Sequence, residues 1–335
     1  MLACALLLSA LATPLAFGQS SASAGSSPPA EVNEAQSSQS PGEADLLTRS
    51  ALTGDWWGAR SSLANHGVSV DFRYTLFYQG LVSGTGDKGF DYGGKMDAFI
   101  DLDSSKMGLW QGGGFRSHIE YSHGGLATNL GGAIFATNLA LYFPVDTPNE
   151  VVATSLYFTQ KLGDRSSIAI GKFNPVDLYA PDPMYGGWGI DRFMNLVLAA
   201  PPSGLIPVVF MGAVVSVAAE PVTWTAVIMD PKDRTNDYSP GDLFQTGVNV
   251  AANATRVATL AGRKTSYGIT GLYSTAEGTD YSSVGGAVGT STKSGSYNVN
   301  VQFKHNLQES SEQPNASSPP RATAPGRWRG VALLL

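Results

Sequence analysis

The sequence has 335 residues, which suits two or three soluble domains or a single barrel. Charged residues make up only 14%, against the ~25% usual for soluble domains, and no 18-residue apolar run follows the first segment. The net charge of −6 provides no basic surface for nucleic acid, so nucleic acid is excluded as a partner. Cys4, the single cysteine, lies in the leader, so no disulfide or thiolate metal site is expected in the mature chain.

The N-terminal region shows three successive patterns. Residues 1–18 form an apolar run ending in small residues and are predicted to be a signal peptide, which implies export. Residues 19–45 contain no aromatic residue and are predicted to be a disordered linker. Thr53 or Asp55 is then expected to cap a short helix from Trp56 to about Asn65. This helix is either a plug of the periplasmic mouth or, more simply, an N-terminal cap that packs its tryptophans.

From residue 68 onward, the hydrophobic period is two, as in a strand with one apolar and one polar face. The pattern is strongest in 68–78, 95–103, 115–122 and 296–304, where Asp, Arg, Lys, His, Glu and Asn occupy the polar face. Weaker candidates lie at about 151–162, 167–173, 208–219, 222–229, 246–259, 265–275 and 284–292. The sequence therefore predicts roughly eleven strands, many of about 9 to 11 residues, which is the length that crosses a bilayer.

The polar faces decide between two all-β folds. Composition alone also fits a secreted β-sandwich, in which strands alternate too. Several ionisable groups on one face of a strand favour a water-filled lumen opposite a lipid-facing side. A sheet in lipid cannot leave unpaired backbone groups at an edge, so its strands must close into an antiparallel transmembrane β-barrel.

Residues 166–204 interrupt this pattern with a long stretch rich in glycine and proline. A loop of such length inside a compact domain is usually functional or disordered. Its aromatic residues favour an ordered functional loop, since disordered segments contain few of them. We therefore expect 174–204, or another long loop, to fold inward and narrow the pore.

Three spaced stretches carry a family resemblance. GKFN, DLY, GGWGIDRFMN and LAAPPSG lie within 171–204, LTGDWWGARSSLANHGVSVDFRYTLFY lies near the start, and IMDPKDRTNDYSPGDLFQTGVNV follows later. Together they resemble the carbohydrate-selective outer-membrane porins of the OprB family over roughly residues 50–305. The resemblance implies passive diffusion of mono- and small oligosaccharides, such as glucose-like sugars, without catalysis or cofactor. It also implies contact with outer-membrane lipid and a monomer or homotrimer.

The resemblance implies about sixteen strands, which is more than the pattern provides. We expect the porin domain to cover 46–305 and to be incomplete. Residues 306–335 are polar, then proline-rich and basic, and are expected to be an atypical tail outside the barrel. From this ending we expect a truncated or frame-shifted gene product.

Sugar transport requires weak, reversible contacts along a narrow passage. The candidate residues are charged groups on the polar strand faces and polar or aromatic groups of the long loop. They are Arg73, Lys95, Asp97, Arg116, Glu120, Lys172, Tyr185, Trp188, Asp191 and Arg192. For any single one of these charges, the simpler and preferred interpretation is that it solvates the wall and pairs with a neighbour, so the polar lumen as a whole is the firmer expectation.

Other functions leave weaker signals. Asp101 and Asp103 share a strand face at a spacing that a glycosidase allows, but they continue a polar row. His118 and Glu120 also share a face, yet the sequence places no third metal ligand near them. The GxGxxG run at 84–89 precedes a strand instead of a helix, so it is predicted to be a hairpin loop. Residues 230–234 are expected to form a turn first and a solute contact second. A secreted or periplasmic carbohydrate-binding protein is the main alternative function.

Overall fold

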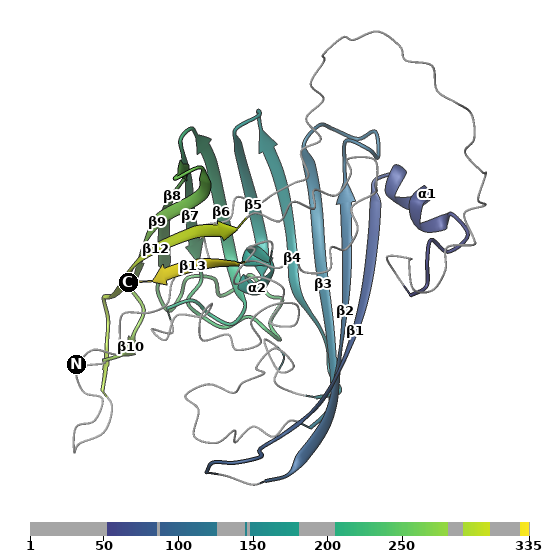
Figure 1. Cartoon of the computed structure of the whole chain (residues 1–335), viewed down its shortest axis with the longest axis horizontal. Coiled ribbons are helices and arrows are strands. Elements are labelled where there is room, and N and C mark those ends of the chain that lie inside the picture. Colours follow the sequence, from purple (N-terminus) through teal and green to yellow (C-terminus); the bar gives the residue numbers. More distant parts are fainter. Residues whose placement is uncertain are drawn as a thin grey trace.

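The computed structural model describes residues 52–85, 88–125, 145, 148–180, 205–280, 291–308 and 329–334. The fold is all-β, with two short helices (Figure 1). The elements in chain order are α1 (Ala59–Asn65), β1 (Val68–Gly80), β2 (Phe90–Asp103), β3 (Gly113–Gly124), β4 (Val151–Leu162), β5 (Ser166–Phe173), α2 (Pro175–Tyr179), β6 (Phe210–Ala219), β7 (Val222–Met229), β8 (Asn249–Leu260), β9 (Arg263–Ser274), β10 (Gly278–Thr279), β11 (Thr292–Lys293), β12 (Ser296–Gln308) and β13 (Arg329–Leu334). Neither described helix is long and apolar enough to cross a membrane.

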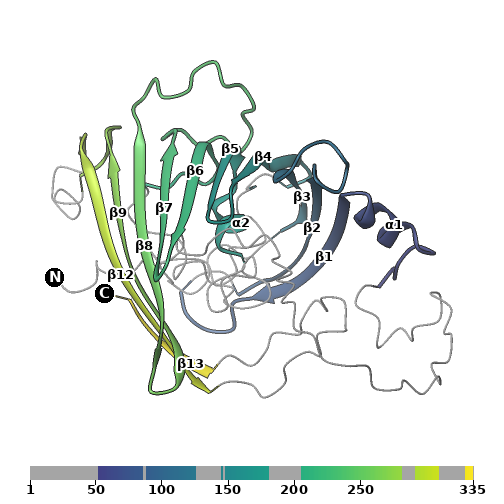
Figure 2. The same cartoon turned by 90° about the horizontal axis from the view of Figure 1, so that it is seen from above.

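Eleven strands form one antiparallel sheet in the order β1-β2-β3-β4-β5-β6-β7-β8-β9-β12-β13. The sheet curves into a trough whose concave side contains α2 (Figures 1 and 2). Within the described residues, β1 and β13 are not paired with each other. Tight turns at 163–165, 220–221 and 261–262 lie at one rim, and the connection 230–248 lies at the other, where β5 also ends and β6 begins.

The two faces of the sheet have the opposite polarity to those of a soluble protein. The convex face exposes large apolar side chains, among them Tyr78 at 73% and Tyr297 at 77%. The concave face buries ionisable groups, with Lys95 at 3% and Glu120 at 1% exposure. A soluble sandwich would bury its apolar faces, so this arrangement fits a wall between lipid and an aqueous lumen.

The strands follow the alternation closely. β4 and β7 have the bounds that the pattern predicts, while β2 and β12 run several residues further. β1 and β2 pair antiparallel from Val68 opposite Leu102 to Gly80 opposite Phe90, so the GxGxxG run does belong to a hairpin loop. The predicted segment 284–292 lies mostly outside the described residues.

Two expectations about the chain ends differ from the structure. Residues 329–334 form β13 and pair with β12, so the expected tail 306–335 contributes to the sheet. The N-terminal helix begins at Ala59 with Gly58 as its N-cap, later than expected, because Trp56 and Trp57 adopt positive φ angles of 51° and 55°. α1 lies beside β1 and not across the mouth of the trough (Figure 2). Trp56 lies near Phe72, with ring centroids 6.4 Å apart, whereas Trp57 is 99% exposed, so only one of the two tryptophans packs as a cap would require.

An apolar cluster lies on the concave side of β4 to β9. It includes Tyr157, Phe173, Phe210 and Met229, and the Phe173 ring stacks between Tyr157 at 4.7 Å and Phe210 at 5.2 Å. Leu178 of α2 belongs to the same cluster. The cluster therefore holds α2 against the inner wall, where it faces the charged side chains of β2 and β3.

Candidate pore-lining site

The strand register brings the charged residues of β1 to β3 into rows on the concave face. Asp97 lies opposite Arg73 on one side and Glu120 on the other, and Asp101 lies opposite Arg116. Directly opposed residues on one face approach closely enough for their side chains to interact. The two-residue period therefore builds the site from three adjacent strands.

Lys95 compensates for two facing carboxylates. Its Nζ lies 3.5 Å from Asp97 Oδ1 and 3.3 Å from Glu120 Oε1. All three side chains are almost completely buried. Like charges directly opposed in a sheet are destabilising, so the ammonium group is required where these carboxylates meet.

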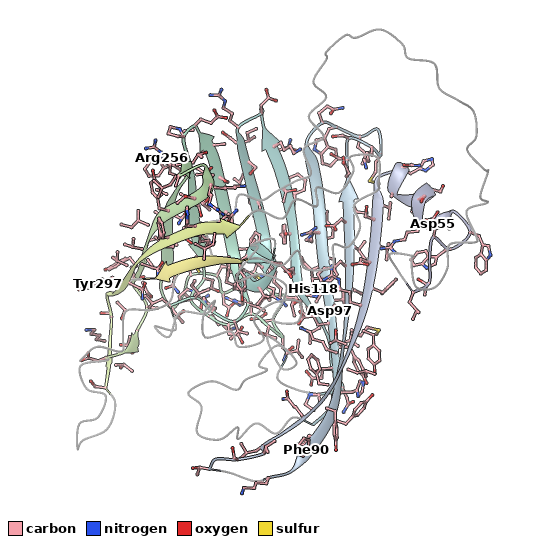
Figure 3. The ribbon with its side chains drawn as sticks, in the orientation of Figure 1. Asp55, Phe90, Asp97, His118, Arg256 and Tyr297 are labelled. Carbon is pink, nitrogen blue, oxygen red and sulfur yellow. The ribbon has the colours of Figure 1, made fainter. Side chains whose placement is uncertain are left out.

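His118 is the centre of the buried group (Figure 3). Its Nδ1 lies 2.9 Å from Asp177 Oδ1, and its Nε2 lies 3.0 Å from Asp97 Oδ1 and 3.2 Å from Glu120 Oε1. Ionised carboxylates only accept hydrogen bonds, so the arrangement is satisfied when both ring nitrogens carry a proton. The geometry is that of an imidazolium held between carboxylates from the wall and from α2.

Asp177 reaches His118 because the chain turns into the lumen after β5. Asn174 caps α2 by accepting a hydrogen bond from Val176 N at 3.0 Å, and Pro175 occupies the first helical turn. Ser155 of β4 donates to Asp177 Oδ2 at 2.5 Å and accepts from Asn174 N at 3.0 Å. The strand pairing of β3 and β4 shifts register beside His118, which is a bulge that re-aims side chains locally.

Asp177, Ser155 and Asn174 were missed by sequence reasoning. The contact between His118 and Asp177 joins residues 59 positions apart, and no strand period links them. Asn174-Pro175 does carry a signal, since Asn is a preferred N-cap and Pro a preferred first helical residue. That signal predicts a helix start but not its direction into the lumen.

Two arginines complete the charged wall. Arg116 donates to Asp101 through Nε at 2.5 Å and Nη2 at 3.0 Å. Arg73 lies with Cζ 5.3 Å from the centroid of the Phe99 ring, and that ring stacks on His118 at 4.1 Å. The Asp101 and Asp103 carboxylates have separate partners in this arrangement. Asp101 binds Arg116, whereas Asp103 accepts from the backbone N–H groups of Ser105 and Lys106 in a turn.

The structure thus places Arg73, Lys95, Asp97, Arg116 and Glu120 together on the concave face. Tyr185, Trp188, Asp191 and Arg192 lie outside the described residues.

The structure corrects the prediction that Lys172 lines the lumen, because this residue lies on the convex face. It is two residues from Ile170, whose side chain is exposed on that face, and it lies opposite Leu156 and Met211. Residues two apart in a strand share a face, so the expectation that Lys172 lines the lumen is wrong. The Lys172 side chain is buried by Thr235 and Tyr238 of the loop that follows β7, and not by the interior of the trough.

A third potential metal ligand stands beside His118 and Glu120, contrary to expectation. Ligand atoms of Asp97, His118 and Glu120 all lie within 4.8 Å of one another. The Lys95 ammonium group already contacts both carboxylates of this group. An internal cation thus already supplies positive charge to two of the three potential ligands.

A second polar cluster organises the 230–248 loop. The fully buried Arg234 donates to Asp230, to Asp237 Oδ2 at 2.6 Å and to Asp242 Oδ1 at 2.6 Å. Lys232 Nζ bridges Asp237 at 2.9 Å and Asp242 at 2.8 Å. Residues 230–234 are therefore the base of an ordered loop and not a simple turn.

These contacts fix the charges of the loop. The backbone N–H of Ser239, followed by Lys232 and Arg234, holds the pKa of Asp237 below its ordinary value. Hydrogen bonds from Lys232 and then Arg234 lower the pKa of Asp242 in the same way.

Both the sequence and the fold of this chain are similar to those of known proteins. The model of the carbohydrate-selective porin family OprB matches residues 87–330, which include β13 in part. The high-pH structure of Pseudomonas putida OprB is 18% identical, with a TM-score of 0.59 over 78% of this chain and 66% of that chain. The low-pH structure of the same protein gives 15% identity and a TM-score of 0.44, over 77% of each chain. No curated protein sequence matches this chain.

The chain spans about two thirds of the length of the first of these porin structures, with which it shares the fold. The family model covers well over half of the sequence and includes the strands that carry the buried charges. The chain therefore belongs to the carbohydrate-selective porins of the OprB family, whose members are outer-membrane proteins, and its curved antiparallel sheet shares the fold of a solved porin of that family.

Proposed function

We propose that this protein lets mono- and small oligosaccharides diffuse passively through a water-filled barrel in the outer membrane. The inverted polarity of the sheet carries the proposal, because ionisable groups line the concave face while apolar side chains cover the convex face. Family membership supports sugars as the solutes. The channel needs no energy source or cofactor.

A row of amides on the concave face gives sugars a second kind of contact. Asn298, Asn300 and Gln302 alternate along β12 and are directed to the same side as Thr270 of β9. Buried side-chain oxygens of all three amides have no protein hydrogen-bond partner within the described residues. Buried polar atoms almost always find partners, so water or solute hydroxyl groups are the natural ones here.

The charged group around His118 is suited to a different role. Its carboxylates and cations are paired with one another, so it exposes little uncompensated charge to a neutral sugar. It also fixes α2, where the long connection 174–209 enters the lumen. We propose that this connection narrows the passage, with Tyr185, Trp188, Asp191 and Arg192 as its contact residues.

Liposome swelling tests the proposal directly. The full chain is reconstituted from detergent, and swelling rates are measured in isotonic glucose, maltose and a zwitterionic solute of similar size. We expect both sugars to enter faster than the zwitterion. Replacing Asn300 and Gln302 together by Leu should slow sugar entry by about fivefold to tenfold, the effect of losing roughly 1 kcal/mol of hydrogen bonding.

Val301→Leu is the matched control, because Val301 lies between the two amides on the convex face. It should leave the swelling rates unchanged. A chain that stays soluble without detergent and binds sugar without transporting it would instead be a carbohydrate-binding protein.

A further inference from the structure

The loop between β7 and β8 covers the outside of the barrel wall. Figure 2 shows this connection on the convex side of the sheet, away from α2. It encloses a pocket of about 510 Å³ whose floor consists of Leu156, Ile170, Ala213 and Ile228. These four residues come from four adjacent strands and share the convex face. The pocket is thus separate from the lumen.

The roof of the pocket is apolar and held in place. Tyr238, Leu243 and Phe244 form it, and all three follow Arg234 in the same loop. The buried Arg234 ties the loop together through Asp230, Asp237 and Asp242. A recess that is formed before its ligand arrives loses less entropy on binding.

One charged side chain also lines this pocket. Lys172 lies one residue before the end of β5, near the rim with the long loops. Its Nζ donates to Thr235 O at 2.7 Å and lies 3.8 Å from the centroid of the Tyr238 ring. An ammonium group has three N–H donors, so further donors remain for an anion. A lysine on a lipid-facing surface is costly unless its charge reaches the head-group level.

We propose that this pocket binds an anionic phospholipid, with one acyl chain under the loop and the phosphate paired with Lys172. The floor continues the convex surface that an outer-membrane barrel presents to lipid, so hydrocarbon is the medium that meets it. The volume lies in the range of ligand pockets, and the single cation matches an anionic head group. The proposal requires the barrel to be in a membrane but does not require sugar transport.

Native mass spectrometry of the full chain released from detergent tests this site. The probes are palmitoyl-oleoyl phosphatidylglycerol and phosphatidylcholine, which share acyl chains and differ in net charge. We expect one phosphatidylglycerol to be retained, with a preference over phosphatidylcholine of about tenfold, as for a charge-assisted contact. Ala213→Phe, which fills the floor, should abolish retention, and Lys172→Met should abolish the preference.

Two further variants keep the test decisive. Ala226→Phe adds the same ring to the convex face outside the pocket and should retain the lipid. Leu243→Asn makes the roof polar without changing a strand, and it replaces Ala213→Phe if that variant does not fold.

Unchanged lipid retention in Ala213→Phe or Leu243→Asn would overturn the site. Equal retention of both lipids by the original chain would overturn the phosphate contact. A dimer lost on Ala213→Phe would show that a second copy of the chain occupies the pocket instead.

Discussion

Arg234 shows how much one side chain organises in this protein. It is fully buried, and its guanidinium group satisfies three carboxylates of the loop that covers the outer wall. Arginine suits this position because its planar group offers five donors in a fixed geometry. A buried Asp230 would be left without a charge partner if the guanidinium group were removed.

Replacing Arg234 by Met should therefore destabilise the loop by about 3 to 5 kcal/mol, the usual effect of breaking a buried ion pair. Urea unfolding in detergent and limited proteolysis at 235–246 measure this change. Lys232→Met removes an exposed partner of the same carboxylates and should change stability by under about 1 kcal/mol. Equal effects of the two variants would contradict the assigned role of Arg234.

The pH dependence of loop stability provides an independent check of the ion pairs that Asp237 and Asp242 form with Arg234 and Lys232. The folded pKa values of Asp237 and Asp242 lie below their ordinary values. Their contribution to stability is therefore complete above a pH of about 4 and is lost as the pH falls through the folded values. Proteolysis of the loop should accelerate only under strongly acidic conditions.

At the scale of elements, α2 is held against the wall by polar contacts of Asp177 and by apolar contacts of Leu178. The Asp177 carboxylate accepts from His118 Nδ1 and from Ser155 Oγ, and Leu178 packs into the apolar cluster. Asp177→Ala leaves two buried donors, His118 Nδ1 and the Ser155 hydroxyl, without the carboxylate that accepts from them, which costs about 1 to 3 kcal/mol for each. Amide exchange in 174–180 should then accelerate by about tenfold to a hundredfold while β3 stays protected.

Asp177→Asn is the conservative variant for this test. It keeps an oxygen acceptor for His118 and should accelerate exchange much less than Asp177→Ala. If neither variant changes exchange in 174–180, the apolar contacts alone hold α2, and the His118 contact is not its anchor.

Strand packing imposes a separate constraint at Gly171 and Gly212. These residues face each other across β5 and β6. A Cβ atom on Gly171 would meet Leu156 O at 2.3 Å, and its φ of +146° also disfavours a side chain. Gly171→Ala should thus prevent folding, which would be measured as loss of the protease-resistant form in detergent. Gly271→Ala in β9 is the control, since nothing lies within 4 Å of its Cβ position. Normal folding of Gly171→Ala would show that β5 can shift to admit a methyl group.

At the scale of the whole molecule, the two-residue period was sufficient to predict every strand of the main sheet except β13, and the face that Lys95, Asp97 and Glu120 share. Lys95, Asp97 and Glu120 follow from that period because strand pairing keeps each row on one face. Lys172 was assigned to the wrong face because the weak alternation of β5 does not reveal which of its faces is turned outward. The loop that buries Lys172 on the convex face could not be predicted from the sequence of β5. The His118–Asp177 contact depends on a turn into the lumen, which no local pattern encodes.

The apolar cluster under α2 gives the two halves of the passage different dielectric properties. β1 to β3 offer paired charges and hydrogen-bonding groups, whereas the wall from β4 to β9 is backed by Tyr157, Phe173, Phe210 and Met229. An ion beside the apolar cluster loses solvation that the side chains of the cluster do not replace, while a neutral polyol loses far less. We therefore expect the wall itself to slow ions relative to sugars, without any binding site for either.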